Sequence, residues 1–213
     1  MNKISLSSTF LYEFDIDMSI ADNYLIRFLD CKNIKEHLVY HEDRLKIPSV
    51  ALSSTDENGN IISFYDKEMF DHIQLCLDQV SSLYLNFNVG ICDSWVTRTK
   101  FGQIGSWHSH SHSIFSGLVY LTDHDECYTE FQIQDPLFSK ITPWLSVDTV
   151  KNNNYIIKYK PQRGKMLIWP STLFHRISMS RDKKTRYTFS FKSWVTGEVY
   201  KKLTGRLNVD IKL

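Results

Sequence analysis

At Tyr84 the hydrophobic pattern of the chain changes its period. From there on, apolar and polar residues alternate in short segments separated by turn residues, a pattern typical of β-strands. The segments expected to be strands are YLNFNVGI, CDSWVTRTKFG, SHSIFSGLVYLT, YTEFQIQDP, YIIKYKP, GKMLIWP and TRYTFSFKSWV. Seven or eight strands in this order predict a β-sandwich or barrel core.

The residues before these strands carry two helical patterns. In 19–31, apolar side chains recur every three or four residues, and Ser19 followed three positions later by Asp22 resembles a capping box. Residues 66–83 repeat the helical spacing, while 4–16 resemble a strand. We therefore predict a mostly β, α+β fold, with the N-terminal helices packed on one side of the β core.

Length and charge narrow the classes of protein to consider. The chain has 213 residues, which fits one domain, and its 25 Lys and Arg residues nearly balance 24 Asp and Glu residues for a net charge of +1. This balance gives no sign of a nucleic-acid partner. An apolar run long enough for a membrane span and a signal peptide are both missing, so we expect a cytoplasmic protein. The irregular segment 136–154 is predicted to be a lid or a substrate loop.

The stretch WHSHSHSIFSGLVYLT, residues 107–122, places His108, His110 and His112 at alternate positions just ahead of an apolar run. In an extended strand alternate side chains point to the same face, so all three could reach one point in space. Imidazole is the commonest metal ligand in proteins. The stretch therefore indicates a site for a first-row transition metal, or else a histidine-rich surface turn.

Two spacings extend the histidine cluster. Gly102 lies six residues before His108, and Gly164 is followed by a strand, Pro170 and then His175. A glycine turn, a strand, a bend at proline and a histidine make an arm that can fold back over the first histidines. The two segments resemble the metal-binding half-motifs of the cupin double-stranded β-helix. In that fold ligands from two antiparallel strands converge at the open mouth of a barrel, leaving coordination positions free.

Arg186 lies eleven positions beyond His175, with Thr188 two residues later on the same strand face. A buried arginine needs an anionic partner because its guanidinium cannot lose its proton. A dicarboxylate could pair with the arginine and the hydroxyl at one end and chelate a metal at the other. The pattern H-x10-R-x-S/T resembles the C-terminal signature of the 2-oxoglutarate- and Fe(II)-dependent oxygenases.

The resemblance extends to a bacterial and phage group of these oxygenases. Its members carry HxH, SGxxYL, GxLxxFPSxLxH and RxSxSF in this order, and the match runs from about Cys92 to Trp194. It implies a double-stranded β-helix in a single domain, 1–213. Residues 91–196 would bind the metal and the co-substrate, and residues 1–90 would support them.

The resemblance also implies roles for single residues. The metal ligands would be His108, His110 and His175. The distal carboxylate of the co-substrate would be held by Arg186, Thr188 and Tyr120. Contacts to the substrate are predicted for Arg98, Trp107 and Trp169 from their positions in the sequence beside the proposed site, and not from the resemblance.

The chain departs from the pattern of this superfamily at His110, where an Asp or Glu is expected. Either the site is a three-histidine triad, or a carboxylate from a loop, such as that of Asp123 or Asp125, supplies the third metal ligand. Strand alternation favours His110. His112 has the same parity, but we expect the chain to bend before it.

The implied activity uses Fe(II), 2-oxoglutarate and O2 and releases succinate and CO2. Hydroxylation is favoured because His110 fills the position that related halogenases leave empty for a halide. The substrate would be an amino-acid, peptide or protein side chain or another small metabolite, with no membrane partner. The alternatives are a three-histidine cupin dioxygenase that does not use 2-oxoglutarate, and a metal-stabilised binding module without activity.

Overall fold

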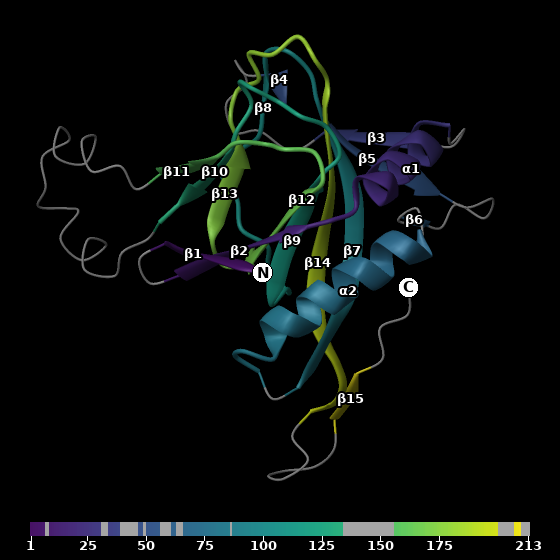
Figure 1. Ribbon diagram of the computed structural model, residues 1–213, viewed down its shortest axis with the longest axis vertical. Helices are drawn as coiled ribbons and strands as arrows, with labels where there is room; N and C mark the ends of the chain where they lie inside the picture. The colour runs from purple at the N-terminus through teal and green to yellow at the C-terminus, as the bar shows by residue number, and fades with distance from the viewer. Residues whose placement is uncertain are drawn as a thin grey trace, which may run out of the picture.

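A large β-sheet with two helices on one side dominates the protein (Figure 1). The computed structural model describes residues 1–6, 9–30, 34–38, 47–48, 50–55, 61–62, 66–85, 87–133, 156–199 and 207–209. The predicted mostly β class with flanking helices is confirmed. The predicted segment 136–154 lies outside the described residues, and neither helix is long and apolar enough to cross a membrane.

The elements in chain order are β1 (Asn2–Leu6), β2 (Thr9–Asp15), α1 (Met18–Leu29), β3 (Ile34–Leu38), β4 (Ile47–Pro48), β5 (Val50–Thr55), β6 (Ile61–Ile62), α2 (Lys67–Ser81), β7 (Asn88–Thr99), β8 (Gln103–Ile104), β9 (Phe115–Tyr120), β10 (Thr129–Gln132), β11 (Ile156–Tyr159), β12 (Lys165–Pro170), β13 (Phe174–Ile177), β14 (Arg186–Val199) and β15 (Leu207–Val209).

The main sheet runs in the order β1-β2-β12-β9-β14-β7-β5-β3, with β15 beside β14 and β6 beside β5. A smaller sheet, β11-β10-β13, stands opposite its centre, and β4 and β8 form a short parallel pair. The N-terminal region thus does more than support the core, because β2 pairs directly with β12 and β5 with β7.

Two apolar clusters fill the spaces between these layers. The larger joins α1 and α2 to one face of the main sheet, through residues such as Tyr24, Phe70 and Phe189. The smaller lies between the main sheet and the β11-β10-β13 sheet and includes Phe131 and Trp169. Alternation along the central strands explains this division, because successive side chains enter opposite clusters. The functional site borders the smaller cluster.

The two strands predicted between Tyr84 and Gly102 are one strand, β7. β7 pairs with β14 in regular register along most of its length. Between Lys192 and Ser193 of β14 the register shifts by one residue, so Cys92 of β7 is the extra residue of a β-bulge. A bulge reverses the phase of inward and outward side chains. The sequence pattern therefore broke at Cys92 although the strand continues.

Both helices form close to the predicted limits, but the cap of α1 is Asp17. Its carboxylate accepts a 2.8 Å hydrogen bond from the backbone N–H of Ser19, so the predicted capping box at Ser19 is wrong. Asp66 plays the same part for α2 by accepting a 3.0 Å bond from the N–H of Met69. An acidic side chain at a helix start accepts a hydrogen bond from a free N–H, and its charge interacts favourably with the positive end of the helix dipole.

Candidate metal centre

Three histidines are brought together by pairing between segments far apart in the chain. His175 lies on β13, and its backbone exchanges hydrogen bonds of 2.9 and 3.0 Å with the backbone of His108. His110 is placed by a 3.0 Å bond from its N–H to the carbonyl of Ser171, in the turn that precedes β13. His108 and His110 are thus both bonded to the backbone of the second arm, which carries His175.

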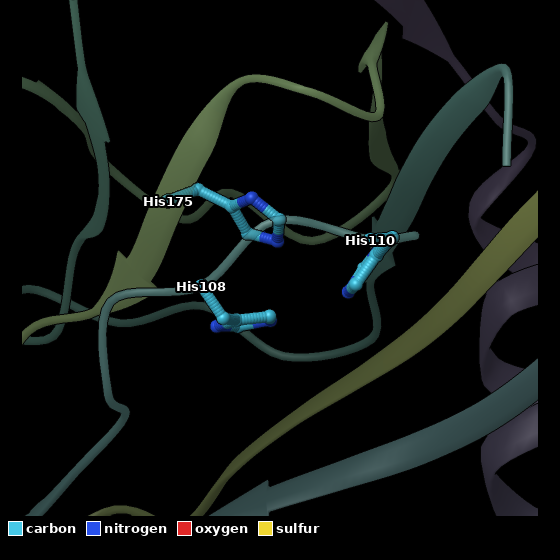
Figure 2. Close-up of side chains that lie close together, drawn as sticks. All are labelled: His108, His110 and His175. Carbon is cyan, nitrogen blue, oxygen red and sulfur yellow. The ribbon is translucent and has the colours of Figure 1, made fainter. Parts of the chain in front are cut away.

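The three imidazoles face a common point (Figure 2). One ring nitrogen from each of His108, His110 and His175 can be chosen so that all three lie within 4.8 Å of one another. The ring centroids are 4.4 to 5.0 Å apart. Three nitrogen donors at this separation can bind one divalent transition metal and leave its other positions open.

Strand alternation is not what gathers His108 and His110. Apart from the bridge at His108, the segment from there to β9 is irregular, and His112 has a positive φ of 53° and an exposed side chain. The reasoning from parity was therefore wrong, although both histidines reach the same point. The expected bend before His112 is present, and that residue lies outside the cluster.

Each histidine of the cluster uses its Nδ1 atom in a hydrogen bond away from the common point. Nδ1 of His108 lies 2.9 Å from the carbonyl of Ser106, and Nδ1 of His175 lies 2.9 Å from the carbonyl of Leu173. Since a carbonyl only accepts, both Nδ1 atoms carry a proton and both Nε2 atoms keep a lone pair. Such partners orient imidazoles and fix their tautomers for metal binding.

Burial keeps the cluster uncharged. Burial, followed by the charges of His108 and Lys192, lowers the pKa of His110 to about 3. Burial also lowers the pKa of His108 and holds that of His175 well below its ordinary value. Near pH 7 the three imidazoles are therefore neutral, which is the state that binds a metal.

These pKa values predict that mild acid destabilises the metal-free protein. Above pH 6.5 the histidines are neutral in the folded and unfolded chain, but below it only the unfolded chain takes up the protons. Between pH 7.5 and 5.5, His110 alone should lower the free energy of unfolding by about 1.4 kcal/mol, with His108 and His175 acting in the same direction. Urea unfolding at both pH values measures this loss, which His110→Gln should reduce. An unfolding free energy that is constant across this window would contradict it.

The cluster opens into a cavity of about 260 Å³ between the two sheets. Its lining combines the histidines with apolar, hydroxyl and cationic side chains and two glycines: Trp95, Thr97, Gly105, His108, His110, Gly117, Leu118, Thr129, Trp169, His175, Arg176, Ile177, Arg186, Thr188 and Ser190. The three predicted metal ligands therefore share one cavity with Arg186 and Thr188.

Arg186 is the most unusual residue of this lining, because it is fully buried at 0% exposure. Its Nη2 donates a 3.0 Å hydrogen bond to Oγ1 of Thr129, while Nε and Nη1 have no partner. Within the described part of the chain, no carboxylate pairs with its guanidinium. A buried charge with two free donors is costly unless an anion completes its surroundings.

Thr129 and Tyr120 shape the surroundings of Arg186. The hydroxyl of Tyr120 donates a 2.6 Å bond to Oγ1 of Thr129, and burial raises the pKa of Tyr120 to about 12, so the phenol keeps its proton. Thr129 Oγ1 thus accepts two bonds, from Tyr120 and Arg186, and its own proton is free to donate into the cavity. Tyr120 itself does not line the cavity, whereas Thr188 does.

The three residues predicted to contact substrate lie in different places. Trp169 lines the cavity with its ring 4.9 Å from that of His175 and its buried Nε1 without a partner. Trp107 lies outside the lining and stacks under the guanidinium of Arg176 at 4.5 Å. Arg98 alternates with the lining residues of β7 and therefore faces away from the cavity.

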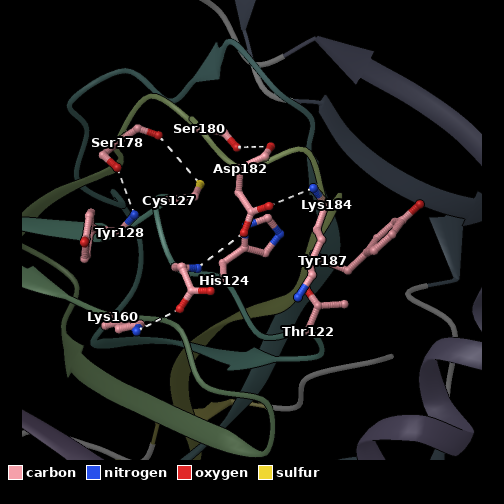
Figure 3. A network of polar contacts seen from close by, with 11 residues as sticks. Thr122, His124, Cys127, Tyr128, Lys160, Ser178, Ser180, Asp182, Lys184 and Tyr187 are labelled. Atoms are coloured by element: carbon pink, nitrogen blue, oxygen red, sulfur yellow. Dashed lines mark hydrogen bonds and ion pairs between the residues drawn. The ribbon is translucent and has the colours of Figure 1, made fainter.

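The loop carboxylates of Asp123 and Asp125, which were the alternatives for the third metal ligand, make other contacts. Asp123 accepts a 2.8 Å bond from the backbone of Arg163, and Asp125 pairs with Lys160 at 2.9 Å. Both partners of Asp125, Lys160 through its ammonium and Asp182 through the carboxylate that accepts the Asp125 N–H, belong to a separate polar network between the loop after β9 and the segment before β14 (Figure 3). Among the described residues, the cluster that could hold a metal contains only the three histidines.

Sequence reasoning missed several residues of the site. Thr129, Trp95 and Arg176 line the cavity outside every motif, and Ser116, although it is the serine of SGxxYL, had no role assigned before its contact with His110. Their strands could be recognised, and alternation within β7 could have placed Trp95 on one face. What the sequence does not contain is which strand stands opposite which, and that pairing selects these residues.

The comparisons with known proteins agree with this geometry. A family model described as "Putative 2OG-Fe(II) oxygenase" matches residues 93–192. A search of curated protein sequences gave no match.

Three solved structures share the fold at 10% identity. The α-ketoglutarate-dependent epimerase SnoN from nogalamycin biosynthesis has a TM-score of 0.60, over 86% of this chain and 78% of that one. HygX from Streptomyces hygroscopicus, with nickel and 2-oxoglutarate bound, has a TM-score of 0.57 over 94% and 92%. A Pseudomonas putida prolyl-4-hydroxylase has a TM-score of 0.54 over 87% and 91%. The predicted double-stranded β-helix is thereby confirmed.

Proposed function

We propose that this chain, which belongs to the 2-oxoglutarate- and Fe(II)-dependent oxygenases, hydroxylates an aliphatic carbon of an amino-acid, peptide or protein side chain or of another small metabolite. The observation that carries the proposal is one cavity that holds three neutral histidines and a fully buried arginine with two free donors. The first group suits a metal ion, and the second suits a carboxylate.

The proposed metal ligands are the Nε2 atoms of His108, His110 and His175. The Nδ1 contacts of these histidines leave the lone pairs on the side of the common point. Three protein ligands leave room for a bidentate co-substrate and for O2. When bound, Fe(II) would activate O2, the oxidant, so that the oxidative loss of CO2 from 2-oxoglutarate is coupled to oxidation of a substrate C–H bond.

The proposed carboxylate site consists of Arg186, Thr129 and Thr188. The free Nε and Nη1 of Arg186 and the free proton of Thr129 are donors toward the cavity. Thr188 lies two residues along β14 on the same face and adds a hydroxyl. Tyr120 acts indirectly, because it holds Thr129 in place. A dicarboxylate bound here would neutralise the buried charge of Arg186.

The size of the cavity favours a small substrate group. At about 260 Å³ it lies near the lower end of ligand pockets, which span roughly 300–1,000 Å³. After the co-substrate has bound, the remaining space suits one side chain or a compact metabolite. Trp95, Leu118 and Ile177 make much of the wall apolar, so the group that enters should be aliphatic.

Hydroxylation is proposed over halogenation because His110 fills the position of the second ligand. Its ring lies 5.0 Å from that of His108 and 4.9 Å from that of His175. A halide would need that position free.

The proposal is tested by turnover of 2-oxoglutarate. Protein loaded with Fe(II) under ascorbate should form succinate from 2-oxoglutarate in air, slowly alone and faster with a substrate. A panel of free amino acids, short peptides and small metabolites, analysed by mass spectrometry, should reveal a product heavier by one oxygen atom. Protein treated with a chelator is the control.

Two outcomes would count against the proposal. Oxygen uptake that does not depend on 2-oxoglutarate would favour a three-histidine dioxygenase. A protein that binds the metal and gains thermal stability, but forms no succinate with any member of the panel, would favour a binding module.

A further inference from the structure

We propose that three serines, Ser116, Ser171 and Ser113, form a one-way chain of hydrogen bonds that fixes the tautomer and orientation of His110. We call this chain the serine relay. It rests on the proposed metal centre, and it concerns the one ligand position at which this chain departs from the Asp or Glu of its superfamily.

The serine relay is continuous and largely buried. Nδ1 of His110 lies 2.7 Å from Oγ of Ser116, which lies 2.7 Å from Oγ of Ser171. Oγ of Ser171 lies 2.6 Å from Oγ of Ser113. Ser113 lies 3.0 Å from the carbonyl oxygen of Phe115. Ser116 and Ser171 are both completely buried, so water does not compete for these bonds.

The end of the relay sets the direction of every bond in it. A carbonyl oxygen only accepts, so Ser113 gives its one hydroxyl proton to the carbonyl of Phe115, or to that of Ser193 at 3.3 Å. Ser171 must then donate to Ser113, and Ser116 must donate to Ser171. No serine proton remains for His110, so the imidazole donates from Nδ1 to Ser116. Its Nε2 therefore keeps the lone pair that a metal needs.

His110 depends on this relay in a way that the other two histidines do not. The Nδ1 atoms of His108 and His175 bond to carbonyls two residues earlier in their own segments. The partner of His110 lies six residues later on β9, and the relay continues to the turn after β12. Ser171 also accepts the backbone N–H of His110, so one residue anchors both its main chain and its ring.

Ser116, Ser171 and Ser113 are thus positioning residues for a metal ligand. The test is a nitrogen NMR measurement on the metal-free protein, labelled with 15N in its histidines, in which long-range couplings show which ring nitrogen carries the proton. The wild-type protein should show His110 protonated at Nδ1. In Ser171→Ala the hydroxyl of Ser116 loses its acceptor and turns to His110 Nδ1, so the proton of His110 should move to Nε2.

Metal binding supplies the second readout, with Zn(II) as the probe. Ser116→Ala and Ser171→Ala should each weaken Zn(II) binding about 10- to 100-fold, as expected when the partner of a ligating histidine is removed. Ser193→Ala is the matched control. Ser193 is equally buried, and its hydroxyl bonds the backbone N–H and carbonyl of Phe115 but carries no bond between Ser113, Ser171, Ser116 and His110. This variant should keep both the tautomer and the Zn(II) affinity.

A wild-type His110 without a proton on Nδ1 would overturn the relay, even if the serine variants failed to fold. Zn(II) binding by Ser116→Ala as tight as in the wild type would overturn it as well. Failure of the proposed function is a separate result: the wild-type protein would then bind metal with the expected tautomer and form no succinate.

Discussion

Alanine in place of His175 is expected to lower the affinity for Fe(II) by more than about 100-fold, because loss of a ligand should exceed the 10- to 100-fold effect of losing a ligand's partner. His110→Ala should have the same effect. Anaerobic calorimetric titration of the purified variants with Fe(II), supported by Zn(II) competition, measures it. Succinate formation should fall in parallel.

The matched control for these variants is His112→Gly. His112 lies in the same histidine-rich stretch, is exposed and has a positive φ that glycine adopts without strain. The His112→Gly variant should bind Fe(II) with the same affinity as the wild-type protein. Loss of binding in His112→Gly together with normal binding in His110→Ala would show that the third ligand had been assigned to the wrong histidine.

Arg186→Met is expected to separate stability from function. Removing two charge-assisted hydrogen bonds to a carboxylate, each worth about 1.5–3 kcal/mol, should raise the KM for 2-oxoglutarate by at least ~100-fold. The protein without ligands should become more stable, by roughly 1–4 kcal/mol, because an unpaired buried charge is replaced by an apolar chain of similar volume. Steady-state kinetics and urea unfolding measure the two effects.

Arg176→Met provides the comparison for Arg186→Met. Arg176 lines the same cavity, but its Nε donates a 2.7 Å bond to Glu130 and its guanidinium stacks over Trp107. Its charge is already paired, so this variant should keep the KM for 2-oxoglutarate and lose stability. If Arg186→Met lost stability and kept its KM, Arg186 would be a structural residue.

The fold could be predicted in outline because the hydrophobic periodicity of each segment, and the order of the segments along the chain, can be read from a single sequence. Two helical stripes followed by alternating segments indicate a β core with helices on one side, and both helices end within two residues of their predicted limits. The prediction failed where tertiary pairing overrides local pattern. The bulge at Cys92 split one strand into two, and β13 was not recognised because its four residues follow a turn without alternation.

The site could be predicted as far as its spacing motifs reached. His108 and His110 were singled out by their alternate positions, His175 by its spacing from Gly164 and Pro170, and Arg186 by its offset from His175. Gly102 and Gly164 do occupy turns with positive φ. The reason given for His110 was wrong, since a loop and not a strand carries it. Ser116 and Ser171 lie in the SGxxYL and GxLxxFPSxLxH motifs, but their role and that of Thr129 could not be found, because the function of a hydroxyl depends on which segments pack against it.

The most direct test of the three-histidine and arginine site is anaerobic titration of the Fe(II)-loaded protein with 2-oxoglutarate, followed by visible absorption. Chelation of 2-oxoglutarate to the iron gives a weak metal-to-ligand charge-transfer band. We expect the band to appear and saturate in the wild type and in Arg176→Met. In Arg186→Met it should need at least ~100-fold more 2-oxoglutarate. A wild-type protein that binds Fe(II) and gives no band, or a band that Arg186→Met leaves unchanged, would contradict the account.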